Sequence, residues 1–184
     1  SVTIKKEDLI SDLSLSKNVQ KDEYGKELIK FDPATKTLDI AYEVVAKTTN
    51  GTGTTVDITD FFDTAASASL GKFQENTIQL IKVAADGSET DVTETYKSQL
   101  NVNSSELKYT ALPELATGEQ YVLRYHATIQ VHDDYTYQSI NKVKAEFDGK
   151  DNSTSKEVKN TEPRLTKSGN YDANSRIITW TVTI

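Results

Sequence analysis

The hydrophobic pattern of this chain repeats every two residues rather than every 3.6. It is clearest over residues 121–131, where the odd positions are apolar and the even positions are mostly polar. This alternation is typical of an antiparallel strand with one buried face. Similar patterns predict further strands, over residues 12–19, 29–31, 37–44, 54–60, 77–83, 106–110, 137–147 and 178–184.

Short connections rich in Thr, Asn, Gly and Ser separate these segments. Such a series of strands predicts an all-β, immunoglobulin-like antiparallel β-sandwich. Residues 32–36 form a plausible turn, so the segments before and after it are expected to form a hairpin. Residues 61–75 are expected to form a loop with a short helical turn, and residues 86–104 an irregular excursion.

The composition changes near residue 148, where residues 148–155 have the composition of a turn. The sequence Leu-Thr-Lys at Lys167 then repeats the Leu-Ser-Lys at Lys17, 150 residues earlier, which is about the length of one domain. We therefore predict an N-terminal linker over residues 1–10 and a sandwich domain over 11–160. Residues 161–184 are expected to be the truncated start of a second similar module, namely its first hairpin.

Composition narrows the possible functions. The 184 residues carry a net charge of −7, which argues against a sequence-independent nucleic-acid binder because such proteins need clustered Lys and Arg. No apolar run approaches the roughly 20 residues of a membrane-spanning helix, so no membrane insertion is expected. The absence of Cys excludes disulfides and thiolate chemistry, and two His residues leave little for a metal site. No metal, cofactor or conventional enzyme is indicated.

Three polar residues occupy positions where the alternation places apolar side chains: Lys17, Asp60 and Asn141. Each shares its face with apolar neighbours, within residues 13–19, 56–62 and 141–147 respectively. Burying any of the three alone would cost several kcal/mol, on the order expected for an unpaired polar group or charge. We therefore expect the three side chains to meet in the core.

Such a cluster has a specific chemistry. Burial lowers the pKa of a lysine and can leave it a neutral nucleophile, whereas a buried aspartic acid can stay protonated and donate to a carbonyl oxygen. Attack of Lys17 Nζ on Asn141 Cγ, with Asp60 shuttling protons, would expel ammonia and leave an isopeptide bond. An ordinary buried salt bridge with a hydrogen-bonded asparagine fits the same pattern.

The sequences around these residues resemble a known family. Leu-Ser-Leu-Ser-Lys17-Asn-Val, Val-Asp-Ile-Thr-Asp60-Phe and Ile-Asn141-Lys-Val-Lys-Ala are similar to three strands of collagen-adhesin (CnaA-like) modules. These are reverse-variant immunoglobulin sandwiches of Gram-positive surface proteins. The segments around Lys167 and Trp180 resemble the start of such a module. In that family a Lys on the first strand bonds an Asn on the last, assisted by an Asp, which implies a Lys17–Asn141 bond promoted by Asp60.

The chain departs from the family pattern in one respect, because the stretch between Lys17 and Tyr42 is longer than usual. Lys30 therefore competes with Lys17 as the crosslinking lysine. Lys30 is disfavoured because its neighbours Ile29 and Phe31 take the apolar face. Lys167 has no Asp or Asn partner within this chain and is expected to be unmodified.

The resemblance implies a non-enzymatic role, apart from a single-turnover autocatalytic crosslink. We expect a structural stalk or adhesin module of a bacterial surface protein, extracellular and anchored to the cell wall through other parts of the parent protein. Its expected partners are adjacent modules of the same protein. The alternative is a module that binds a host matrix protein or glycan in a groove between modules.

Overall fold

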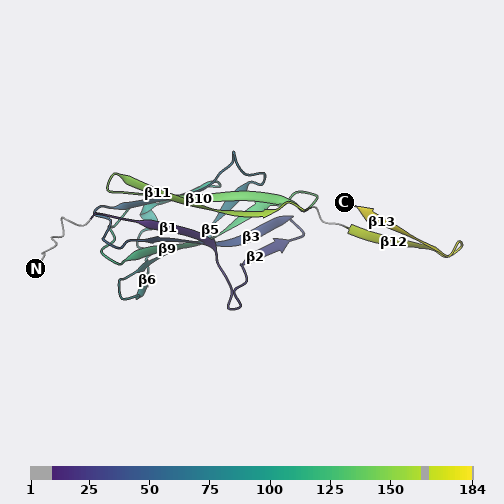
Figure 1. Cartoon of the computed structure of the whole chain (residues 1–184), viewed down its shortest axis with the longest axis horizontal. Coiled ribbons are helices and arrows are strands. Elements are labelled where there is room, and N and C mark those ends of the chain that lie inside the picture. The colour runs from purple at the N-terminus through teal and green to yellow at the C-terminus, as the bar shows by residue number, and fades with distance from the viewer. Residues whose placement is uncertain (1–9, 163–165, 184) are drawn as a thin grey trace, which may run out of the picture.

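The computed structural model describes residues 10–162 and 166–183. Two antiparallel sheets lie face to face, which confirms the predicted all-β, immunoglobulin-like sandwich (Figure 1). The first sheet has the order β1 (Ser14–Val19), β3 (Thr37–Lys47), β9 (Gln120–Gln130), β5 (Gly71–Val83) and β6 (Glu89–Asp91), and β2 (Ile29–Asp32) also pairs with β3. The second has the order β11 (Lys150–Asn160), β10 (Tyr137–Phe147), β4 (Val56–Phe62), β8 (Glu106–Leu112) and β7 (Leu100–Val102).

The core lies between the two sheets, and the two-residue alternation decides which side chains enter it. On β9, the odd positions from Tyr121 to Ile129 are fully buried. On β4 the even positions from Val56 to Phe62 are buried, and the odd ones are only partly so. Among the described residues, no helix is long and apolar enough to cross a membrane.

β11 corrects the prediction that residues 148–155 form a turn. Only Asp148 and Gly149 connect β10 to β11, both with positive φ, as a two-residue hairpin turn requires. The rest of the segment pairs with β10 along its whole length. The hydrophobic pattern did not indicate this strand because it lies at a sheet edge, where Val158 is its only buried side chain.

The way in which β1 and β2 pair with the edge of β3 explains the long stretch of sequence between Lys17 and Tyr42. Val19 of β1 pairs with Tyr42, and Ile29 of β2 pairs with Ile40, so the two strands follow one another along β3. Gln20 and Leu28 both hydrogen-bond to Ala41 of β3, and residues 21–27 between them leave this edge as a protruding loop. The predicted hairpin of β2 and β3 is confirmed.

The two segments with unclear patterns prove to contain strands. Within residues 61–75, β4 continues to Phe62 and β5 begins at Gly71, and the connection is a non-helical turn rather than the expected helical one. Residues 86–104 contain β6, a single 3-10 turn over Lys97–Gln99 and β7.

A separate hairpin, β12 (Thr166–Asp172) and β13 (Ile177–Thr183), lies beyond one end of the sandwich (Figure 1). Its turn repeats that of β2 and β3: Asp172 accepts from the Asn174 N–H as Asp32 accepts from the Ala34 N–H. The apolar face of this hairpin is uncovered, since more than half of the Tyr171, Ile178 and Trp180 surfaces is exposed. An isolated two-stranded hairpin is marginally stable in water, so this face requires a second layer.

Gly71 offers a test of the packing between the sheets. A Cβ at this position would lie 2.2 Å from the Phe62 ring, and the Gly71 backbone has no positive φ that would by itself disfavour alanine. We expect Gly71→Ala to lower the free energy of unfolding by about 1–3 kcal/mol through overpacking, measured by urea denaturation. Phe62→Leu should cost less stability in the Gly71→Ala background than in the wild-type chain, because it relieves the clash; additive losses in this double-mutant cycle would contradict the steric explanation.

Candidate functional site

Four strands bring four polar side chains together between the sheets. Lys17 comes from β1 and Tyr125 from β9 of the first sheet, whereas Asp60 comes from β4 and Asn141 from β10 of the second. Asp60, Asn141 and Tyr125 are fully buried, and Lys17 is 5% exposed. The cluster therefore spans the core from one sheet to the other.

The backbone register accounts for this convergence. Asp60 pairs with Val143 across the β4–β10 ladder, so Asn141 is its diagonal neighbour on the same face. Lys17 lies opposite Val44, a buried residue of β3, and so takes the inward face of β1. Each side chain enters the core because its strand alternates in step with apolar neighbours.

The hydroxyl of Tyr125 is the centre of the cluster. Lys17 Nζ forms an ion pair with Asp60 Oδ2 and also donates to Tyr125 Oη at 2.6 Å. Tyr125 Oη donates to Asp60 Oδ2 at 2.8 Å, and Asn141 Nδ2 donates to Tyr125 Oη at 2.9 Å. The lysine nitrogen and the asparagine amide nitrogen thus contact the same oxygen atom.

Aromatic rings surround the lysine nitrogen. Lys17 Nζ lies 5.1 Å from the centroid of the Tyr42 ring and 5.2 Å from that of Tyr125, and these two rings are stacked. Phe73 packs against Tyr125 at a centroid distance of 5.2 Å. The rings take the place of water around the ammonium group, and their faces interact favourably with its charge.

Burial changes the protonation of each group. It lowers the pKa of the Lys17 ammonium below its usual value, although the adjacent Asp60 carboxylate opposes this. It raises the pKa of the Asp60 carboxyl, against the opposing charge and hydrogen bonds of Lys17 and Tyr125. Burial and the Asp60 charge together hold the pKa of Tyr125 well above 10, so its hydroxyl stays neutral. Both shifts of the pair favour a neutral amine beside a neutral acid.

Two buried oxygens of the cluster have no hydrogen-bond partner, Asp60 Oδ1 and Asn141 Oδ1. Both are acceptors when Asp60 is ionised, so neither can donate to the other. Protonation of Asp60 would turn Oδ1 into a donor and offer a partner for a carbonyl oxygen in the same pocket. The unpaired oxygens therefore suit the neutral form of the pair as well.

The structure brings some of the predicted site residues together and places others apart. Lys17, Asp60 and Asn141 lie in one buried cluster, whereas Lys30 is exposed on β2. Asn141 is on the penultimate strand of the sandwich rather than the last, because β11 follows it. The side chain of Lys167 lies outside the described residues. Sequence reasoning missed Tyr125, since its alternation marks a core residue without showing that its hydroxyl has polar partners.

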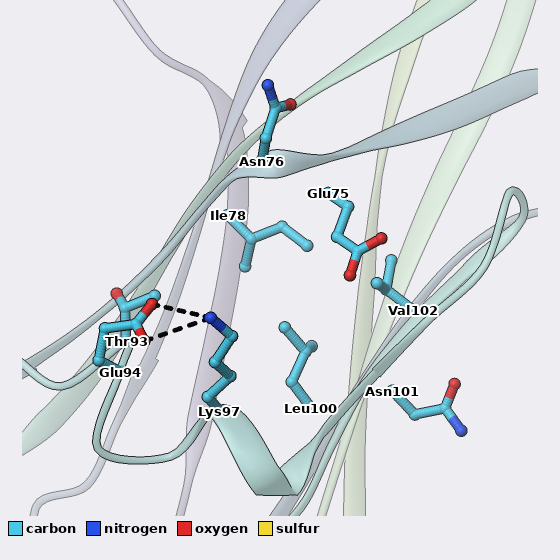
Figure 2. Close-up of a pocket in the computed structure, with 9 residues that line it drawn as sticks. All are labelled: Glu75, Asn76, Ile78, Thr93, Glu94, Lys97, Leu100, Asn101 and Val102. Carbon is cyan, nitrogen blue, oxygen red and sulfur yellow. Dashed lines mark hydrogen bonds and ion pairs between the residues drawn. The ribbon is translucent and has the colours of Figure 1, made fainter.

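Charged residues outside this cluster do not form a metal centre: in the part of the chain that the structure describes, no group of three or more His, Cys, Asp or Glu is placed to hold a metal ion. The sandwich also carries an open groove of about 610 Å³ (Figure 2). Ile78, Leu100 and Val102 contribute its apolar lining, and Lys97 pairs with Glu94 beside them, as the dashed lines in Figure 2 show. This groove lies within one module, whereas the sequence predicted a ligand groove between modules.

No protein-family model and no curated protein sequence matches this chain. Solved structures with a similar arrangement are adhesin and pilin domains, the class that the sequence motifs resemble.

Three of these solved structures illustrate the likeness. ACE19, the collagen binding subdomain of the Enterococcus faecalis surface protein ACE, is 12% identical with a TM-score of 0.46, over 66% of this chain and 88% of ACE19. The collagen-binding domain of a Staphylococcus aureus adhesin is 11% identical with a TM-score of 0.40, over 72% of this chain and 94% of that domain. The major pilin SpaD of Corynebacterium diphtheriae is 15% identical with a TM-score of 0.47, over 80% of this chain and 34% of the pilin.

The ion pair itself can be tested by removing its cation. In Lys17→Met, Asp60 loses its charged partner, and breaking a buried pair in this way typically costs about 3–5 kcal/mol. Because burial raises the Asp60 pKa in the folded state, the folded variant binds a proton that the unfolded chain releases near pH 4. Its stability should therefore be greatest in acid and fall as the pH rises through the folded-state pKa, measured by urea denaturation between pH 4 and 8.

The control is the double variant Lys17→Met with Asp60→Asn, which has no ionisable group at this site. The free energy of unfolding of this double variant should not show the fall between pH 4 and 8 that Lys17→Met shows. The same pH dependence in both variants would show that Asp60 is not its source.

Proposed function

We propose that this chain is a self-crosslinking structural module, a stalk or adhesin segment of an extracellular bacterial surface protein. Its crosslink joins Lys17 Nζ to Asn141 Cγ, and Asp60 promotes the reaction. The observation that carries this proposal is the buried cluster in which the lysine nitrogen and the asparagine amide contact one hydroxyl beside Asp60. The protein is not an enzyme in the usual sense, because the reaction occurs once and on its own side chains.

The reaction begins with the Lys17–Asp60 ion pair. Transfer of one proton from Nζ to the carboxylate leaves a neutral amine and a neutral acid, as burial favours. The amine then attacks Asn141 Cγ while the Asp60 acid donates to the carbonyl oxygen, which stabilises the developing negative charge. The Nζ–Cγ bond forms, the Cγ–Nδ2 bond breaks, and the amide nitrogen leaves as ammonia with one proton that came from Nζ.

The bond would link the two sheets and close a loop between residues that are 124 positions apart. By analogy with disulfides, closing a loop of this length stabilises the fold by on the order of 5 kcal/mol through chain entropy. A chain without Cys gains in this way a covalent link that reductants do not open. Such a link suits a surface protein under mechanical load.

The C-terminal hairpin supports a tandem arrangement. We propose that β12 and β13 open a second similar module, with the sandwich domain ending near residue 160 and residues 161–184 belonging to its neighbour. The turn that repeats β2–β3 and the uncovered apolar face support this proposal, because the corresponding face of β3 is buried by the opposite sheet. Adjacent modules of the same protein are then its first partners.

Binding of a host matrix protein or glycan stays a prediction. Immobilised collagen and fibrinogen, tested by surface plasmon resonance with the purified chain, would detect it.

The intact mass of the purified, denatured chain tests the crosslink directly. Because the reaction expels ammonia, we expect a mass about 17 Da below the sequence value. Peptide mapping should recover the segments that contain Lys17 and Asn141 as one linked species. A full sequence mass in the wild-type chain would contradict the proposal.

Matched variants identify the residues that react. Asp60→Ala and Lys17→Arg should both show the full mass, because the first removes the acid and the second replaces a titratable amine with a permanently charged guanidinium. Lys30→Arg is the control and should keep the deficit, since Lys30 is exposed. A deficit that survives in Lys17→Arg but not in Lys30→Arg would assign the bond to Lys30.

Mechanical unfolding gives an independent prediction. Only the segments outside the crosslinked loop can extend: within the sandwich these are residues 11–16, before Lys17, and residues 142–160, which comprise the rest of β10 and all of β11. Together they span at most about 90 Å when fully stretched. Single-molecule pulling from the two chain ends should show this short extension in the wild-type sandwich. Asp60→Ala should extend by several hundred ångströms, on the order of 3.4 Å per residue of the whole domain.

A further inference from the structure

We propose that the Tyr125 hydroxyl is a catalytic group of this reaction, and that it carries a proton from the attacking nitrogen of Lys17 to the leaving nitrogen of Asn141. This inference rests on the proposed crosslink and assigns to one residue a step that the Lys, Asp and Asn do not complete by themselves. Tyr125 comes from β9, which lies between β3 and β5 in the first sheet; it pairs with Tyr42 of β3 and lies opposite an irregularity in β5.

Tyr125 Oη contacts both nitrogen atoms that exchange places on Cγ. Lys17 Nζ lies 2.6 Å from this oxygen and Asn141 Nδ2 lies 2.9 Å from it. A phenol has one proton to donate and two lone pairs to accept with, and Tyr125 uses all three: it accepts from the two nitrogens and donates to Asp60. Asn141 also interacts with Asp60 and lowers the pKa of its carboxyl, but Tyr125 Oη is the atom at hydrogen-bond distance from Nδ2.

Asp60 already has hydrogen-bond partners of its own in the cluster. Its Oδ2 already accepts from Lys17 and Tyr125, and its Oδ1 has no partner. The Asn141 carbonyl oxygen is also unpaired, so once the proton that Lys17 gives to the carboxylate resides on Oδ1, this atom would donate to that carbonyl oxygen. We therefore assign to Asp60 the donation to the carbonyl oxygen of Asn141, and to another group the donation to the leaving nitrogen Nδ2.

The relay balances atom by atom. After attack, Nζ carries a positive charge and Nδ2, now bound to a tetrahedral carbon, has a lone pair that can accept a proton. Nζ gives one proton to Oη while Oη gives its own proton to Nδ2. The Cγ–Nδ2 bond then breaks, ammonia departs, and Tyr125 is again a neutral phenol. The net change is one proton moved from the attacking nitrogen to the leaving nitrogen.

Tyr42 provides a matched control within the same pocket. Its ring stacks on that of Tyr125 and lies equally close to Lys17 Nζ, but its buried hydroxyl has no hydrogen-bond partner. Tyr42→Phe and Tyr125→Phe therefore each remove one buried hydroxyl from the same stack of rings. Only Tyr125→Phe removes contacts to the reacting nitrogens.

The experiment follows the mass of the full chain during cell-free synthesis. Samples are quenched in acid and denaturant at intervals, and the fraction that has lost about 17 Da is measured for each variant. We expect Tyr125→Phe to form the bond at least about 100-fold more slowly, the usual contribution of a positioned proton-transfer group. Tyr42→Phe should react at the wild-type rate. Cooperative unfolding of each purified variant shows that it is folded.

The outcomes separate the two proposals. A wild-type chain of full mass would contradict the crosslink itself. A wild-type deficit with equal rates in the two phenylalanine variants would overturn the role of Tyr125 and leave the crosslink standing. If Tyr125→Phe does not fold, 3-fluorotyrosine at position 125 decides the matter, since it keeps the hydroxyl contacts and makes the phenol a stronger acid. A relay predicts a changed rate and pH profile; an unchanged rate and profile would make Tyr125 a spacer.

Discussion

The structure depends on a charged amine buried between two sheets. A lysine in an apolar core is costly unless partners compensate it, and here the polar partners, Asp60 and Tyr125, come from β4 and β9. Satisfying Lys17 therefore fixes the position of β1 against these two strands, and Tyr125 extends the network to Asn141 of β10. Replacing the ion pair by a covalent amide would remove the buried charge and keep the same geometry. The crosslink and the packing of the strands would thus both compensate the cost of burying Lys17.

The position of the cluster decides which parts of the sandwich a crosslink protects. Lys17 lies near the start of the domain, so almost all of the first sheet falls inside the closed loop. β11 falls outside it, and its contacts with the segment before β1 are made by side chains, such as Asn152 donating to the Leu13 carbonyl. This polar edge strand covers the opening between the sheets without carrying the covalent path.

Tyr125 adds a fourth functional group to the lysine, carboxyl and amide of the cluster. One neutral hydroxyl connects all three groups, and the adjacent Tyr42 supplies only its ring. The two tyrosines have the same burial, and only their hydrogen-bond partners distinguish a chemical role from a packing role. A ring stack of this kind also keeps water away from the reacting atoms, which strengthens every electrostatic interaction among them.

The sequence by itself determined the sandwich and the inward faces of most strands, because alternation with a period of two follows directly from the pleat. It also singled out Lys17, Asp60 and Asn141, since a polar residue in step with apolar ones is visible in one dimension. It missed β11, whose polar edge carries no alternation, and it missed Tyr125, whose pattern is that of any core tyrosine. Only the tertiary structure decided which hydroxyl meets which nitrogen, because that depends on how strands distant in sequence pack across the core.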